Sequence, residues 1–132
     1  MPQIGTCADS DLLVTPTTDA TSYGVGSTPV LTVTIKNAGQ VACQRAVGRG
    51  AVELIVTSGS DRIWSSQDCS TNDPQDVLTL LPGEQHVLHV TWSGHRSAPA
   101  CAGARPAVQP GTYRLTARVG TLRQLGATFH FG

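Results

Sequence analysis

The stretch QPGTYRLTARVG, residues 109–120, decides the fold class. Its apolar side chains fall on every second position, so that Tyr113, Leu115, Ala117 and Val119 alternate with Arg114, Thr116 and Arg118. This period of two is typical of a β-strand with one buried face and one solvated face. Tyr113 follows a Pro-Gly turn, where the hydroxyl of a tyrosine corner hydrogen-bonds back to the preceding loop. The stretch therefore predicts strand F of an immunoglobulin-like (Ig-like) sandwich.

Similar alternation recurs along most of the chain. It predicts a first strand near residues 12–15 and further strands in PVLTVTIKN (29–37), AVELIVTS (51–58), RIWSS (62–66), VLTLLPGEQHVLHVTW (77–92) and GATFHF (126–131). In the last of these we expect Ala127, Phe129 and Phe131 to point inward. Pro82 and Gly83 predict a type II turn between two short strands. The expected fold is an all-β, Ig-like β-sandwich of seven to eight antiparallel strands.

Length and charge limit the classes of partner. A chain of 132 residues is the size of one domain, so residues 1–132 are expected to form a single Ig-like domain. Nine Lys and Arg balance nine Asp and Glu, which gives no electrostatic reason to expect nucleic acid as a partner. No run of about 18 apolar residues occurs, so we expect no direct membrane insertion by this segment.

The four cysteines are Cys7, Cys43, Cys69 and Cys101, and none of them forms a Cys-x-x-Cys pair. An even number at wide spacing favours two structural disulfides and an oxidising compartment over a metal site. Of the three possible pairings we favour Cys7–Cys43, because an antiparallel first strand brings these residues together. Cys69–Cys101 then joins the two long loops, residues 67–76 and 93–110. The wide spacings argue against a redox-active pair.

Cys7 could also be the lipidated cysteine of a lipoprotein. Such a cysteine follows an apolar signal segment and a small residue, whereas Cys7 follows Thr6 and no apolar segment precedes it. We therefore expect Cys7 in a disulfide.

The order TVTIKNAG, RIWSSQDC, LLPGEQHVLHVTWSG and VQPGTYRLTARVG resembles the repeating core of BsuPI-type domains, named for an intracellular proteinase inhibitor of bacilli. It is still more similar to cysteine-bearing, Ig-like exported domains of membrane-anchored proteins in high-GC Gram-positive bacteria. The resemblance covers about residues 28–120 and is strongest at structural positions: Trp64, Pro82–Gly83–Glu84, Trp92 and Gly111–Thr112–Tyr113. It implies the extracytoplasmic portion of a longer, membrane-anchored cell-envelope protein.

Residues that carry chemistry are sparse. No Gly-x-Ser-x-Gly nucleophile elbow is present. His86 and His89 are three residues apart on a predicted strand, which sends their rings to opposite faces and disfavours a shared metal. We therefore expect no catalytic residues, no metal and no cofactor.

The loop 93–110 is the candidate binding surface, because long ordered loops on a β-sandwich are where such folds bind partners. It carries His95, Arg96 and Arg105, and Trp64 on a predicted edge hairpin is a further candidate. The leading hypothesis is a non-catalytic module that contacts a protein or cell-wall ligand. The loop could equally be a solvated segment stapled by Cys101. A proteinase inhibitor of the BsuPI type is the alternative function, and an unrecognised enzyme the third.

Overall fold

The computed structural model describes residues 4–70 and 73–132, and its regular structure is β-strand apart from two short 3-10 turns, Asp9–Asp11 and Pro99–Cys101. In the described residues the strands are β1 (Leu12–Thr18), β2 (Ser22–Tyr23), β3 (Val30–Asn37), β4 (Cys43–Ala46), β5 (Val52–Ser58), β6 (Asp61–Ser65), β7 (Val77–Leu80), β8 (Gln85–Thr91), β9 (Gly111–Val119) and β10 (Leu122–Phe131). The predicted all-β class is confirmed.

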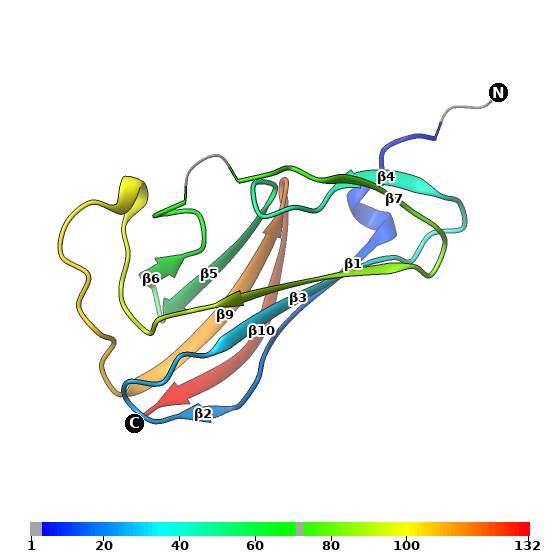
Figure 1. Cartoon of the computed structure of the whole chain (residues 1–132). Helices are drawn as coiled ribbons and strands as arrows, with labels where there is room; N and C mark the ends of the chain where they lie inside the picture. Colours follow the sequence, from blue (N-terminus) through cyan, green and yellow to red (C-terminus); the bar gives the residue numbers. More distant parts are fainter. Residues whose placement is uncertain (1–3, 71–72) are drawn as a thin grey trace.

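Two sheets face each other across the core (Figure 1). One has the strand order β1-β3-β8, and the other has the order β2-β10-β9-β5-β6. A small third sheet, β4-β7, extends one end of the structure. All described pairs are antiparallel except β2 with β10, which is parallel. This arrangement is that of a β-sandwich.

The core is built from the alternating positions that the sequence indicates. Strand β3 buries Leu31, Val33 and Ile35 completely, and the predicted inward residues of β9 are also buried. Trp92, directly after β8, has no exposed surface and packs nearly perpendicular to the rings of Phe129 and Phe131, with ring centroids 6.5 and 5.7 Å apart. Trp92, one of the structural positions of the resemblance, is thus part of the core.

Three parts of the strand prediction need correction. Thr116, which the alternation places on the solvated face of β9, is buried. Ala127 is exposed rather than buried, because an irregularity in the β9–β10 register between Leu125 and Thr128 shifts the alternation. Strands β2 and β4 were not predicted, because β2 has only two residues and the sequence of β4, CQRA, has no alternation of apolar and polar residues. The expected coil 67–76 includes residues 71–72, which lie outside the described residues.

Both structural turns form as expected. In the turn Leu81–Glu84 the amide of Glu84 donates to the carbonyl of Leu81 at 2.8 Å, and Gly83 has a φ of 82°, a conformation that favours glycine. The hydroxyl of Tyr113 donates to the carbonyl of Gln109, which completes the tyrosine corner at the start of β9.

The disulfide Cys7–Cys43 fixes the N-terminal segment to β4. Both cysteines are buried, and their Cα atoms are 4.9 Å apart. The amide of Cys7 donates to the carbonyl of Gln44 at 2.8 Å, and Arg45 donates to the carbonyl of Cys7 at 2.7 Å. This pairing and the second disulfide, Cys69–Cys101, are the ones that the sequence analysis favours, and two disulfides favour an oxidising environment. Within the described part of the chain, no helix is long and apolar enough to cross a membrane.

Candidate functional site

The loop 93–110 connects β8 to β9 and lies along the open side of β6, the outer strand of the five-stranded sheet (Figure 1). Ser97 provides the contact with this edge. Its amide donates to the carbonyl of Ile63 at 3.0 Å, and its hydroxyl accepts from the amide of Ser65 at 3.2 Å. An uncovered edge strand exposes unpaired backbone groups, so Ser97 both protects β6 and anchors the loop.

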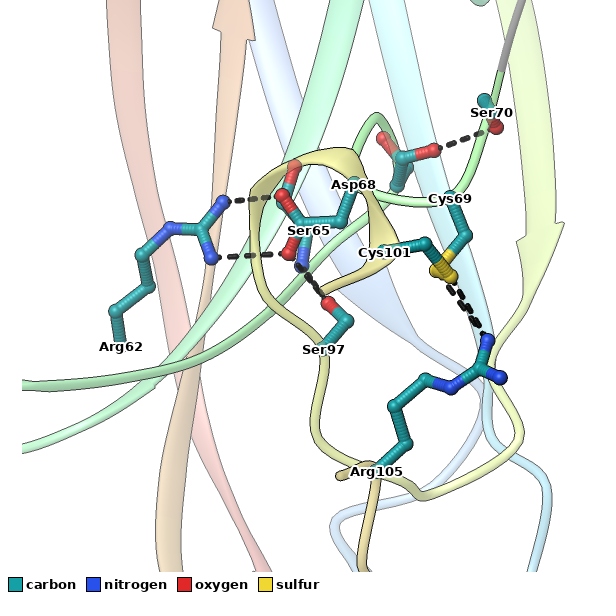
Figure 2. The surroundings of a disulfide bond; sticks show 9 residues. Arg62, Ser65, Asp68, Cys69, Ser70, Ser97, Cys101 and Arg105 are labelled. Atoms are coloured by element: carbon teal, nitrogen blue, oxygen red, sulfur yellow. Dashed lines mark hydrogen bonds and ion pairs between the residues drawn. A yellow bond between two sulfur atoms is a disulfide. The ribbon is translucent and has the colours of Figure 1, made fainter. Parts of the chain in front are cut away.

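Beneath the loop lies a buried carboxylate. Asp68 is 5% exposed and accepts two hydrogen bonds from Arg62, at 2.9 and 2.6 Å, and one from the hydroxyl of Ser97 (Figure 2). Burial raises the pKa of Asp68, but the hydrogen bonds from Arg62 and Ser97 outweigh it and hold the pKa below its ordinary value. The charge of Asp68 is therefore fully compensated, and it ties the loop to the segment after β6.

At the tip of the loop, Cys101 is bonded to Cys69 (Figure 2). The guanidinium of Arg105 lies against this disulfide, with Nη1 at 2.8 Å from the sulfur of Cys101 and 3.7 Å from that of Cys69. Arg105, a predicted ligand contact, therefore contacts a disulfide in this structure.

The other predicted loop residues also have partners within the chain. Arg96 forms two hydrogen bonds with the carboxylate of Asp61, each 3.0 Å long. The hydrogen bond from Arg96 is the main reason that the pKa of Asp61 lies below its ordinary value. His95 places Nδ1 2.8 Å from the carbonyl of Arg105, and its own carbonyl accepts from the indole of Trp92 at 3.0 Å. These contacts shape the loop.

Trp64 lies on β6, half-buried, with its ring centroid 5.7 Å from that of Trp92. It packs against the side of the hydrophobic core. The structure thus brings His95, Arg96 and Arg105 together on one loop and places Trp64 with the core aromatics.

A groove of about 290 Å³ runs beside the loop. Its lining combines one ion pair with mostly apolar or uncharged surface: Ser58, Asp61, Ile63, Arg96, Pro106–Gly111 and Tyr113. The sequence predicted the loop 93–110, and with it Arg96 and residues 106–110 of this lining, but it did not indicate Asp61 as a groove residue. Asp61 lies in the turn of the β5–β6 hairpin, which the sequence does indicate. Its contact with Arg96, 35 residues later, depends on tertiary structure and has no local sequence pattern.

A second, larger depression of about 340 Å³ shares Tyr113 with the groove. It lies where β5, β9 and β10 present Thr57, Arg114, Leu125 and Thr128. None of the predicted binding residues lines it. Over residues 4–70 and 73–132, no three His, Cys, Asp or Glu side chains gather in a metal-binding cluster.

Comparison of the sequence with models of protein families and with curated proteins finds no match. Solved structures do resemble the fold. A β-glucosidase from Erythrobacter marinus is 17% identical with a TM-score of 0.54, over 92% of this chain and 15% of the enzyme. A β-glucosidase from Listeria innocua in complex with isofagomine is 12% identical, with the same TM-score, over 92% of this chain and 16% of the enzyme.

A cycloisomaltooligosaccharide glucanotransferase from Paenibacillus is 17% identical with a TM-score of 0.51, over 96% of this chain and 14% of the enzyme. The chain thus spans only 14–16% of the length of these enzymes. At such identities the likeness shows the fold alone, and it assigns neither a family nor an activity to this chain.

Proposed function

We propose that this chain is a non-catalytic, Ig-like binding module of an extracytoplasmic cell-envelope protein, and that it contacts a protein or cell-wall ligand through the groove beside the loop 93–110. The observation that carries the proposal is the way this loop is built. Ser97 fixes its base to β6, Cys101 fixes its tip to Cys69, and Arg96 fixes its side to Asp61. An anchored loop offers a partner a preformed surface, so that little ordering entropy is lost on binding.

The strand order supports the Ig-like type. A sheet of β1-β3-β8 packed on β10-β9-β5-β6 corresponds to strands A-B-E and G-F-C-C′ of Ig-like sandwiches. The tyrosine corner at Tyr113 then lies at the start of strand F, where such domains carry it. The two disulfides and the resemblance to exported, membrane-anchored domains support an extracytoplasmic location.

The groove suits a peptide-like ligand. Its floor and wall include Ile63, Val108 and Pro110, while Arg96 and Asp61 place one positive and one negative group at its side. Their side chains are 37% and 58% exposed, so both charges can be reached from solvent. An extended peptide, from a protein or from the peptide part of a cell wall, carries the amide, carboxylate and ammonium groups that match this surface.

Charge variants test the proposal. We expect Arg96→Glu combined with Arg105→Glu to abolish capture of the partner from an envelope extract. A charge swap, Asp61→Arg with Arg96→Asp, keeps an ion pair at this place but reverses its direction, and it is also expected to lose capture. Arg123→Glu, at an exposed position of β10, is the charge-matched control and should capture normally. Undiminished capture by both variants, with folding confirmed by circular dichroism, would exclude the groove and the loop 93–110 as the contact surface.

A further inference from the structure

The two disulfides lie in different surroundings. Cys7 and Cys43 are only 2% and 7% exposed, under the N-terminal segment and β4. Cys69 is exposed and Cys101 is half-buried, and both belong to loops rather than to strands. A thiol from solvent can therefore approach Cys69–Cys101 much more easily than Cys7–Cys43.

The backbone at the exposed disulfide adopts an uncommon conformation. Ala100 and Cys101 have φ angles of 60° and 59°, in the left-handed region that non-glycine residues rarely occupy. Such conformations persist only where the surrounding structure imposes them. The bond between Cys101 and Cys69 is one such constraint, so opening it allows these two residues to relax.

Arg105 places a positive charge beside this bond. Its Nη1 atom lies 2.8 Å from the sulfur of Cys101 and 0.9 Å farther, at 3.7 Å, from that of Cys69 (Figure 2). A disulfide sulfur is a weak hydrogen-bond acceptor, whereas a thiolate carries a full negative charge. A neighbouring arginine therefore stabilises the thiolate much more than the disulfide, and it stabilises Cys101 more than Cys69.

Contrary to the expectation from the cysteine spacing, we propose that Cys69–Cys101 is a site of thiol–disulfide exchange whose substrate is a dithiol reductant, with Cys69 as the attacked sulfur and Cys101 as the leaving group. In the first step a thiolate of the dithiol forms a bond with the sulfur of Cys69. The Cys69–Cys101 bond breaks, and its electron pair remains on the sulfur of Cys101, where Arg105 compensates the charge.

In the second step the other thiol of the reductant, as a thiolate, attacks its own partner sulfur in the mixed disulfide. Cys69 leaves as a thiolate and takes a proton from water. The dithiol has then been oxidised to a disulfide, and the two electrons it lost have reduced Cys69 and Cys101. No other co-reactant is needed.

Reduction should release the tip of the loop and leave its base in place. The contacts of Ser97 with β6, the Arg62–Asp68 pair and the Arg96–Asp61 pair do not involve the disulfide. Cys7–Cys43 holds a different part of the chain. The exchange site lies in the same loop as the proposed binding surface, and reduction removes one of the three anchors of that loop, Cys69–Cys101, while the anchors at Ser97 and Arg96 remain.

Limiting dithiothreitol on the native, oxidised chain tests the proposal, with alkylation at timed intervals and peptide mass spectrometry as the readout. We expect Cys69 and Cys101 to be alkylated at least about tenfold faster than Cys7 and Cys43. Arg105→Gln should slow the reduction roughly three- to tenfold, and Arg105→Lys should restore part of the rate. Arg123→Gln is the control and should leave the rate unchanged. Equal rates at the two disulfides, or a rate in Arg105→Gln equal to that of the native chain, would overturn the proposal.

A second experiment distinguishes a specific effect of Arg105 on the Cys101 thiolate from a general increase in the mobility of the loop. In a Cys69→Ser variant the pH midpoint for alkylation of Cys101 should lie below about 8.5, the value of an ordinary cysteine, and should rise when Arg105→Gln is added. A midpoint that Arg105→Gln does not move would contradict the role of Arg105. Glutathione, a monothiol, should accumulate as a mixed disulfide on Cys69, and accumulation on Cys101 instead would reverse the assigned direction of attack.

Discussion

Arg62 and Asp68 form a bidentate ion pair beneath the loop 93–110, with the two hydrogen bonds at 2.9 and 2.6 Å. The pair is asymmetric, because the side chain of Arg62 is 39% exposed and that of Asp68 is 4% exposed. The hydroxyl of Ser97 completes the site from the loop. One buried carboxylate thus connects β6, the segment that follows it and the candidate binding loop.

Asp68 should make stability depend on pH in the acidic range. Its pKa is lower in the folded chain than its ordinary value, so its stabilising contribution is complete above the unfolded value of about 3.9 and is lost as the pH falls through the folded value. Asp68→Asn should reduce this acid sensitivity and lower the free energy of unfolding at pH 7 by about 1–3 kcal/mol. Urea unfolding at pH 7 and pH 3 measures both effects, and an equal loss on acidification in the two proteins would contradict the assignment.

The tyrosine corner should contribute a measurable hydrogen bond. Tyr113→Phe keeps the ring, which stacks 6.0 Å from Phe129, and removes the hydroxyl that donates to Gln109. We expect a loss of about 1 kcal/mol in the free energy of unfolding, because a partly buried hydrogen bond is lost. Tyr23→Phe is the comparison, since its hydroxyl contacts Asp19 at an exposed position and should cost less. Equal losses in the two variants would argue against a special role for the corner.

Proline substitutions should report on the edge position of β8. At the two ends of the β3–β8 pair, the amide of Trp92 donates to the carbonyl of Pro29 at 2.9 Å and the amide of Asn37 donates to the carbonyl of Glu84 at 3.0 Å. Because hydrogen-bonded pairs alternate along an antiparallel ladder, the even-numbered residues of β8, such as Leu88 opposite Val33, bond to β3 through their amides. The amide of Val87 therefore points away from the sheet. We expect Val87→Pro to cost less than about 1 kcal/mol and Leu88→Pro to cost about 3 kcal/mol or more. Thermal unfolding of the two variants decides this, and a large loss in Val87→Pro would mean that the amide of Val87 has a partner.

The two disulfides should differ in their contribution to stability. They close loops of similar length, 36 and 32 residues apart in sequence, each worth about 3–4 kcal/mol if only chain entropy matters. Removing Cys69–Cys101 also relaxes the left-handed backbone of Ala100 and Cys101, which offsets part of that loss. The free energy of unfolding should therefore fall more in Cys7→Ser with Cys43→Ser than in Cys69→Ser with Cys101→Ser. The reverse order in a denaturant titration would contradict this reading of the loop.

Much of the fold could be predicted from local patterns. The alternation in β3 and β9, the turn at Gly83 and the corner at Tyr113 are local and need no knowledge of distant contacts. The cysteine pairing also followed from the expected antiparallel first strands. Strand β2 could not be found in this way, because two residues show no period and their partner in β10 lies at the other end of the chain. Ala127 was placed wrongly because a change in strand register leaves no trace in composition.

In the candidate site, too, local features could be predicted from the sequence and contacts between distant residues could not. The sequence singled out the loop 93–110 and its arginines, but it could not show what those arginines contact. Asp61 lies 35 residues before Arg96, and Cys69 lies 36 residues before Arg105, so both contacts depend on tertiary structure. Asp68 looked like an ordinary loop aspartate, since nothing around it in the sequence indicates burial.

The most direct test of the proposed function is site-specific photo-crosslinking within the cell envelope. A photoreactive residue at Gln109, exposed in the lining of the groove, is compared with one at Arg123, exposed on β10. We expect a defined adduct, with a protein or with cell-wall peptide, from position 109 and none from position 123. The adduct should disappear when Arg96→Glu and Arg105→Glu are introduced. An adduct only from position 123, or one from position 109 that persists after both charge reversals, would contradict the proposed binding function.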